Sequence, residues 1–207
     1  MILECRNITF GYKKNNILFK NINFVTTTND VLGIVARSGF GKSTLAKIIS
    51  GYEIQVSGDI FLDGKGISKK GYNPIQLIYQ HPEKAINPLW KMKKVIKEFD
   101  VDDIDYVIDN IGIDRNLLNR YPSELSGGEL QRFCIARVLG NLTKFIIADE
   151  ITTMLDSITQ AQIWDFLINE CKKRSIGLIV ISHNINLLDK LCNNIINLEE
   201  YSIENFK

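Results

Sequence analysis

The chain has 207 residues, of which 45% are hydrophobic and 24% charged, and its formal net charge is +1. This length suits one domain with a substantial core, and the composition is typical of a globular rather than a disordered protein. A net charge so close to zero gives no reason to expect nucleic acid as a partner, because binding to a phosphate backbone depends on an excess of Lys and Arg.

Hydropathy and cysteine spacing indicate the cellular compartment in which the protein is expected. No apolar run approaches the roughly 20 residues needed to cross a bilayer, and the N-terminus does not begin a signal peptide. We therefore expect the protein to stay in the cytosol. The four cysteines lack a Cys-x-x-Cys pair, which predicts reduced thiols rather than metal ligands. Lysines at 91, 93, 94 and 97 form the one local basic cluster; it is typical of a solvated surface, with a partner or lipid headgroups as the alternative.

A short apolar run with β-branched residues, 31–35, predicts a buried strand, and residues 45–49 predict a helix. The glycine-containing segment between them makes the strand, loop and helix order that a phosphate-binding P-loop requires. In such a loop, backbone N–H groups and the helix dipole face anionic oxygens. The residues predicted to bind the nucleotide here are Ala36, Arg37, Ser38, Gly39, Phe40, Gly41, Lys42, Ser43 and Thr44.

Individual roles within this loop follow from its chemistry. Lys42 is predicted to contact the β and γ phosphates, Ser43 to bind Mg²⁺ through its hydroxyl, and Thr44 to support the α-phosphate. The stricter motif begins with glycine, whereas this chain has Ala36. Alanine costs about 1 kcal/mol if the position needs a positive φ and little if it does not. We expect the substitution to be tolerated.

A second segment, Leu125-Ser126-Gly127-Gly128-Glu129, precedes apolar residues at helical spacing, so Ser126, Gly127 and Gly128 are predicted to open a helix with outward-facing amides. With Gln131 and Arg132 after it, this segment resembles the signature sequence of the ATP-binding cassette (ABC) ATPases. The resemblance covers nearly the whole chain. It implies ATP and Mg²⁺ as cofactors, and a dimer in which the signature residues, Glu129 included, close over a nucleotide held by the other subunit.

The resemblance also implies an α/β fold, that of a P-loop NTPase with a RecA-like core, an antiparallel β subdomain and an inserted α-helical subdomain. Strand-like residues 2–10, 17–24 and 58–62 match the antiparallel sheet. We place the whole chain in one ABC domain, with residues 1–81 and 125–207 as nucleotide core and 82–124 as helical subdomain. The core is expected to have a largely parallel sheet with phosphates at the carboxyl ends of its strands. A capping box of Ser157 and Gln160, a short helix from about Asn184 and a last strand at 195–198 complete the expected elements.

Further site residues fall in the order that the family uses. An apolar strand at 145–149 ends in Asp149 and Glu150 and resembles the Walker B segment. Asp149 is predicted to hold Mg²⁺ through a water, and Glu150 to orient and deprotonate the attacking water. By the same resemblance, His183 contacts the γ-phosphate, Gln80 reaches the metal, and Tyr12 stacks on adenine. The predicted metal residues are Ser43, Gln80 and Asp149.

One loop departs from the family. Asp156 matches the D-loop, which crosses the dimer interface, and it is counted with the nucleotide-binding residues. The family usually has proline and then Thr-Ser-Ala after the catalytic Glu, whereas this chain has Ile151-Thr152-Thr153-Met154. Without the fixed φ of proline, we expect a looser loop.

The run from Gln80 to Pro88 resembles one found after this glutamine in bacterial dipeptide, oligopeptide and nickel importers, with His81 and Ile86 replacing the usual Asp and Leu. This implies an ATP-hydrolysing subunit of a peptide- or nickel-type importer, peripheral at the cytoplasmic face of the membrane. Its implied partners are membrane-spanning permease subunits, a second ATP-binding subunit that is a paralogue or a copy, and indirectly a solute-binding protein.

Two alternatives stay open. One is a non-transport ABC ATPase of DNA repair or translation, although the span from Thr44 to Ser126 leaves no room for a long coiled-coil insertion and the chain holds a single cassette. The other is a cassette that binds ATP with little hydrolysis of its own, which the departures at Ala36 and Ile151 keep open.

Overall fold

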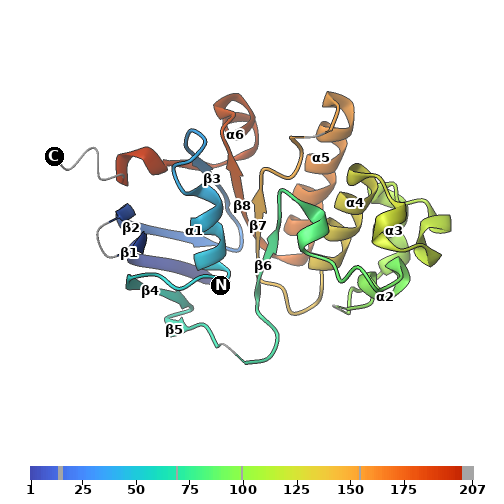
Figure 1. Cartoon of the computed structure of the whole chain (residues 1–207), viewed down its shortest axis with the longest axis horizontal. Helices are drawn as coiled ribbons and strands as arrows, with labels where there is room; N and C mark the ends of the chain where they lie inside the picture. The colour runs from blue at the N-terminus through green and yellow to red at the C-terminus, as the bar shows by residue number, and fades with distance from the viewer. Residues whose placement is uncertain (14–15, 69, 99, 154, 202–207) are drawn as a thin grey trace.

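The structure is a computed structural model in which residues 1–13, 16–68, 70–98, 100–153 and 155–201 are described. Two sheets and a layer of helices lie side by side (Figure 1). The antiparallel sheet has the order β2-β1-β4-β5. Its strands are β1 (Ile2–Lys13), β2 (Asn16–Thr27), β4 (Ser57–Leu62) and β5 (Lys65–Gly66). The predicted early strands therefore pair with one another.

The second sheet has the order β6-β7-β8-β3-β9, and all of its neighbouring strands are parallel. It consists of β3 (Val31–Val35), β6 (Ile75–Ile78), β7 (Phe145–Asp149), β8 (Gly177–Ser182) and β9 (Asn194–Asn197). The predicted parallel sheet is confirmed, and its last strand begins and ends one residue earlier than expected. The apolar runs in these strands reflect burial on both faces, which parallel sheets require.

Alternate residues of β7 and β8 pack into two different cores. Phe145 and Ile147 face a core shared with the antiparallel sheet and α1 (Lys42–Ile49). Ile146 and Ala148 face a core shared with the helices on the other side. Those helices are α2 (Met92–Ile96), α3 (Ile104–Ile111), α4 (Gly127–Val138), α5 (Ser157–Arg174) and α6 (Ile185–Leu191). The central sheet is thus covered on both faces.

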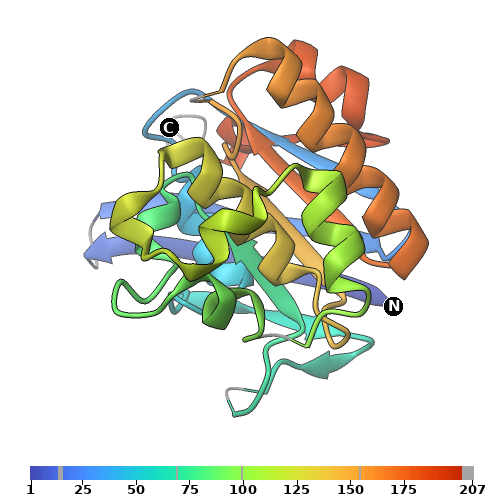
Figure 2. The same ribbon diagram turned by 90° about the vertical axis from the view of Figure 1, so that its right-hand side faces the viewer.

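The helices α2, α3 and α4 gather at one side of the molecule, with α5 next to them (Figure 2). Short 3-10 turns join or end the elements: η1 (Pro82–Lys84), η2 (Arg115–Asn119), η3 (Pro122–Glu124) and η4 (Leu198–Tyr201). The helical character predicted for 82–124 agrees with this arrangement. Because α4 shares the same apolar core, the subdomain boundary at 124 stays a prediction.

The predicted capping box at the start of α5 is wrong. The N-cap is Asp156, one residue earlier than expected, and its Oδ1 accepts hydrogen bonds from the backbone N of Ile158 (3.1 Å) and Thr159 (3.0 Å). Gln160 donates instead from Nε2 to the carbonyl of Leu155 (2.9 Å). A carboxylate is a strong N-cap acceptor and also suits the helix dipole, so it takes precedence over the following serine.

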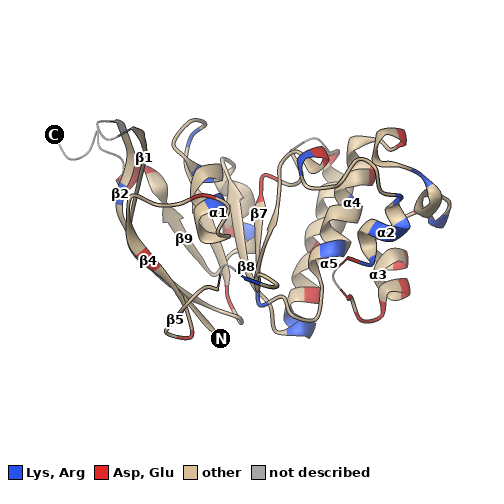
Figure 3. Ribbon diagram, turned by 60° about the horizontal axis from the view of Figure 1, so that its bottom comes forward, with Lys and Arg blue, Asp and Glu red and all other residues tan. Residues whose placement is uncertain are grey.

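Charged residues occur in both the sheets and the helices of the ribbon, and lysines of α2 lie at the outer end of the helical layer (Figure 3). Lys93 and Lys94 are exposed, and Nζ of Lys94 lies 3.9 Å from the ring centroid of Trp90. Within the described part of the chain, none of the helices has the length and apolar character needed to span a bilayer. The four cysteines are free, and three of them are buried.

Gly177, at the start of β8, is expected to tolerate no side chain. An added Cβ would meet the ring of Phe145 and would lie 2.8 Å from the carbonyl O of Thr27. Gly177→Ala should therefore destabilise the fold by about 1–3 kcal/mol, as overpacking of a dense core does. Urea unfolding measures this, with Gly66→Ala as control because a Cβ there meets no atom within 4 Å. Equal unfolding midpoints for the two variants would contradict the packing described.

Candidate nucleotide-binding site

The loop lies between β3 and α1, in the strand, loop and helix order that the sequence predicts. Gly39 and Gly41 have φ values of 89° and 88°, in the left-handed region that favours glycine. Gly41 also lies close under Leu18, whose Cδ2 would be 2.5 Å from an added Cβ. Ala36, in contrast, has no positive φ. The alanine therefore avoids the cost that a positive φ would bring, and its tolerance in a working site stays a prediction.

Lys42 is the first residue of α1, and the loop folds around its side chain. Its Nζ donates to the carbonyl oxygens of Ala36 (2.7 Å) and Arg37 (3.1 Å). The same atom lies 3.4 Å from Oε1 of Glu150, and the side chain is only 7% exposed. A buried ammonium needs such partners, because burial without them is costly. Lys42 is thus held at the centre of the loop.

A cavity of about 290 Å³ opens beside this loop. It brings together nine of the predicted site residues, and its lining consists of Tyr12, Leu18, Ser38, Gly39, Gly41, Lys42, Ser43, Thr44, Gln80 and Glu150. Tyr12 is 67% exposed at its rim, and its hydroxyl lies 3.0 Å from Oγ1 of Thr44. One face of the cavity is therefore aromatic and the other is a helix N-terminus.

Three predicted loop residues do not line the cavity, namely Ala36, Arg37 and Phe40. The backbone N of Arg37 donates to Oε1 of Glu199 (2.7 Å), and its guanidinium pairs with the same carboxylate. The guanidinium carbon also lies 5.0 Å from the ring centroid of Phe40. Both side chains therefore lie outside the cavity lining.

The carboxylate of Glu150 joins three predicted site residues. Its Oε2 accepts from Nε2 of Gln80 (3.2 Å), and its Oε1 lies 3.1 Å from Nδ1 of His183 as well as close to Lys42. Gln80, Glu150 and His183 follow the neighbouring strands β6, β7 and β8, whose carboxyl ends meet at one edge of the sheet. Glu150 itself has φ 49°, an uncommon value for a side-chain-bearing residue.

Asp149, one residue earlier, is 4% exposed, and its Oδ1 has no hydrogen-bond partner among the described residues. Burial raises the pKa of Asp149, while a hydrogen bond with Ser43 acts in the opposite direction. Ser43, Asp149 and Gln80 offer only oxygen ligands to a cation, which suits Mg²⁺. No group of three His, Cys, Asp or Glu side chains in the described segments could hold a metal by itself. A cation here would need further oxygens, such as those of phosphates.

The second predicted segment forms the N-terminus of α4. Ser126 is the N-cap, and its Oγ accepts from the backbone N of Glu129 (3.3 Å). Glu129 Oε2 in turn accepts from the backbone N and the Oγ of Ser126, both at 2.7 Å. These hydrogen bonds lower the pKa of Glu129. The helix start expected from the sequence is confirmed, and Gly127 and Gly128 form its first turn with no side chains to cover the amides.

A family model for the ABC transporter matches residues 19–153. The chain belongs to the ABC transporter family. A curated relative, the nickel import system ATP-binding protein NikE of Staphylococcus aureus (strain bovine RF122 / ET3-1), is 33% identical over 211 residues, which cover 96% of this chain and 87% of the relative.

Solved structures of ABC proteins have the same fold. CbiO1 of Clostridium perfringens, part of the ABC transporter complex cbiONQ, matches with a TM-score of 0.77 and 25% identity over 94% of this chain and 83% of that one. The dimeric post-hydrolysis state of the ATP-binding cassette MJ0796, bound to ADP and Pi, matches with a TM-score of 0.79 and 24% identity over 94% and 93%. The predicted fold, a P-loop ABC ATPase, is confirmed, and the chain is an ATPase of this family.

The two segments predicted to face phosphates lie at separate cavities of this ABC ATPase. Ser126, Gly128 and Glu129 line a cavity of about 330 Å³ together with Asp156. None of the residues that line it lines the P-loop cavity. The structure therefore brings the predicted D-loop aspartate to the signature segment, and it does not bring either one to the P-loop of the same chain.

The loop between Glu150 and Asp156 is tied to α5 although it lacks the family's usual proline. Nε1 of Trp164 donates to Oγ1 of Thr152 (3.2 Å), and Ile151 is buried in the helix-side core. Thr153 contributes a hydrogen bond from its Oγ1 to the carbonyl of Glu150 (3.1 Å). The adjoining position 154, where the family has alanine, lies outside the described residues. This hydrogen bond of Trp164 could not be predicted from the sequence, because no motif indicates that an indole N–H contacts a threonine twelve residues earlier.

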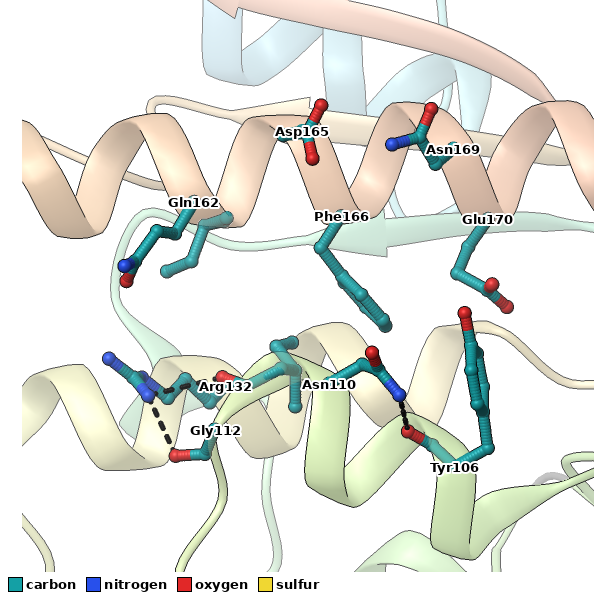
Figure 4. A pocket seen from close by; sticks show the side chains of 11 residues that line it. Tyr106, Asn110, Gly112, Arg132, Gln162, Asp165, Phe166, Asn169 and Glu170 are labelled. Carbon is teal, nitrogen blue, oxygen red and sulfur yellow. Dashed lines mark hydrogen bonds between the residues drawn. The ribbon is translucent and has the colours of Figure 1, made fainter.

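A third cavity, of about 390 Å³, lies between α5 and the α3 and α4 helices, and none of its lining residues is a predicted site residue (Figure 4). On its lower wall, Nη1 of Arg132 donates to the carbonyl oxygens of Ile111 (3.1 Å) and Gly112 (2.7 Å). Arg132 thus fastens the C-terminus of α3 to the signature helix α4. The cavity lies where these helices meet, and its larger volume is no reason to place the nucleotide site there.

Proposed function

We propose that this chain binds and hydrolyses ATP to power a bacterial ABC importer of the nickel or peptide type. The observation that carries the ATP-hydrolysis part is the meeting of Lys42, Gln80 and His183 at the carboxylate of Glu150, beside the P-loop cavity. A base next to a phosphate-binding loop is the arrangement that in-line attack of water on a γ-phosphate needs. The side chains come from four different segments, so their convergence is a property of the fold.

In this proposal the P-loop amides and Lys42 bind the phosphates, and Thr44 supports the α-phosphate. Lys42 exchanges its carbonyl partners for phosphate oxygens, so its charge stays paired throughout. Tyr12 offers its exposed ring to adenine. Glu150 accepts the proton of the attacking water, while Gln80 and His183 hold that carboxylate and face the γ-phosphate.

Ser43, Asp149 and Gln80 are the residues that would hold Mg²⁺ with the phosphates. When bound, the cation supplies positive charge that neutralises the phosphate oxygens. The unpartnered Oδ1 of Asp149 supports this role, because a water on the cation would give that buried atom a donor. Burial raises the pKa of Asp149, and a bound cation would favour the charged form of this carboxylate.

The separate cavities support a dimer with two shared sites. Ser126, Gly127, Gly128 and Glu129 would close over the nucleotide of a second ATP-binding subunit, with Asp156 at the boundary. That subunit is a paralogue or a second copy. We further propose permease subunits as membrane partners, with a solute-binding protein acting indirectly, and a peripheral location at the cytoplasmic face. CbiO1, which is part of a transporter complex, supports this assembly by analogy.

For the cargo, the similarity to NikE favours nickel or a nickel chelate over peptides. No residue of an ATP-binding subunit touches the transported solute, so this part of the proposal depends on the relative alone. It is the part that an uptake measurement must decide.

Lys42→Ala should remove ATP binding, because the P-loop loses its one buried cation. Titration with a fluorescent ATP analogue in the presence of Mg²⁺ is expected to show an affinity at least about a hundredfold weaker, as for a charge-assisted contact to phosphate. Lys172→Ala, which removes an exposed lysine of α5, is the matched control. Unchanged affinity in the Lys42 variant would remove this residue from the site.

Glu150→Gln should keep nucleotide binding and lose turnover. The amide has nearly the same shape but cannot accept a proton, so phosphate release is expected to fall about a hundredfold or more while the affinity for ATP persists. The measurement is ATPase activity with the permease subunits present. Equal turnover of variant and wild type would show that Glu150 is not the base.

Transport is tested in cells that carry the chain with its neighbouring permease genes. Uptake of radioactive nickel should stop when Lys42→Ala replaces the wild type, and uptake of a labelled dipeptide measured in parallel tests the other cargo class. Co-purification identifies the partners. Recovery of the protein with ribosomes or DNA and without a membrane subunit would rule out the transport function.

A further inference from the structure

A carboxylate from the C-terminal end of the chain contacts the start of the P-loop. Oε1 of Glu199 accepts from the backbone N of Arg37 at 2.7 Å and from its Nε at 3.2 Å. Oε2 of Glu199 accepts from Nε of Arg37 (3.1 Å) and forms an ion pair with Nη2, also at 3.1 Å. Glu199 lies on η4, which ends the described part of the chain, and the family model stops at residue 153.

Strand pairing explains how the carboxylate reaches the loop. β9 pairs in parallel with β3, the strand that leads into the P-loop, and Asn197 is opposite Val35. The residues that follow these two strands therefore leave the sheet at the same edge, next to each other (Figure 1). Leu198 is buried in the core, and Oδ1 of Asn197 accepts from the backbone N of Glu199 (3.1 Å), so the turn that carries the carboxylate is itself fixed.

The contact continues from Glu199 to the predicted phosphate-binding lysine. The peptide N–H of Arg37 is bonded to Glu199, and the carbonyl of the same residue accepts from Nζ of Lys42 (3.1 Å). Fixing one side of this residue therefore limits where its carbonyl, and with it the ammonium, can lie. The guanidinium of Arg37 neutralises the carboxylate, so no net negative charge is added beside a site meant for phosphates.

We propose that Glu199 is a positioning residue of the nucleotide site, which holds the first turn of the P-loop through the backbone N–H of Arg37. Arg37 then belongs to the support of the loop, because its N–H and guanidinium are both bonded to Glu199. The inference rests on the proposed binding of ATP at this loop. It assigns a role to a segment that does not line the P-loop cavity.

The test is the dissociation constant of Mg·ATP for the full chain, measured by titration with a fluorescent ATP analogue. Glu199→Ala should weaken binding about tenfold, the effect of losing one hydrogen bond to a charged group. Glu199→Gln keeps an acceptor for the backbone N–H and should bind within about twofold of wild type. Glu200→Ala, at the exposed neighbouring glutamate, is the matched control and should not change binding.

If Glu199 only stabilised the fold, the alanine and glutamine variants would both melt at a lower temperature, and the glutamine variant would not recover the affinity for Mg·ATP. If Glu199→Ala is unfolded by circular dichroism, Glu199→Asp takes its place; it keeps the charge but retracts the oxygens, and it should also weaken binding. Wild-type affinity in the alanine or aspartate variant, or equal weakening in the glutamine variant, would overturn the assignment.

The Lys42→Ala titration separates this inference from the function on which it rests. If wild type binds ATP and Lys42→Ala does not, the nucleotide site stands whatever the Glu199 variants do. If wild type does not bind, or Lys42→Ala binds equally well, the site itself is wrong and the role of Glu199 falls with it.

Discussion

Parallel pairing of the central strands is the constraint on which the rest of the structure depends. β8 lies between β7 and β3, with Ile181 opposite Asp149 and Ser182 opposite Val35. Each strand therefore ends at the same edge, and each is followed by residues predicted to act in the nucleotide site. These are the P-loop after β3, Glu150 after β7 and His183 after β8. Both faces of the sheet are buried, so a slip of one residue would turn apolar side chains away from their own core. The register is fixed by packing, and the site follows from the register.

This arrangement keeps buried charges paired. Lys42 contacts two carbonyl oxygens and Glu150, while Glu150 also contacts an amide and an imidazole. An ammonium or carboxylate taken from water without partners would cost several kcal/mol. In the proposed function, phosphates would enter by exchange of partners, because Lys42 and Glu150 already have acceptors and donors that a ligand would replace. Asp149 is the exception among the described site residues, with one carboxylate oxygen that no group satisfies.

Local patterns predicted most of this edge from the sequence. β3, β7 and β8 are short apolar runs, and the helix start after each predicted phosphate-facing segment was also expected from its residues. Local patterns were weaker where two residues compete for one role, as at the start of α5. The pattern of Ser157 and Gln160 suggested a capping box, but Asp156 stood next to it and became the cap. The φ of Glu150 and the absence of strain at Ala36 could not be read from residue types.

Contacts between residues far apart in the sequence could not be predicted for a different reason. Glu199 contacts Arg37, 162 positions earlier in the chain, and that contact exists only because β9 pairs with β3.

The same limit applies to the signature segment. Its residues read as phosphate ligands, yet in one chain they line a cavity apart from the P-loop. Since α4 is packed into the helix-side core and fastened to α3 by Arg132, its N-terminus cannot reach the P-loop of its own chain without breaking that packing. In the proposed dimer, the nucleotide held by the partner's P-loop brings its phosphates to the start of α4, so the proposed catalytic site needs two subunits.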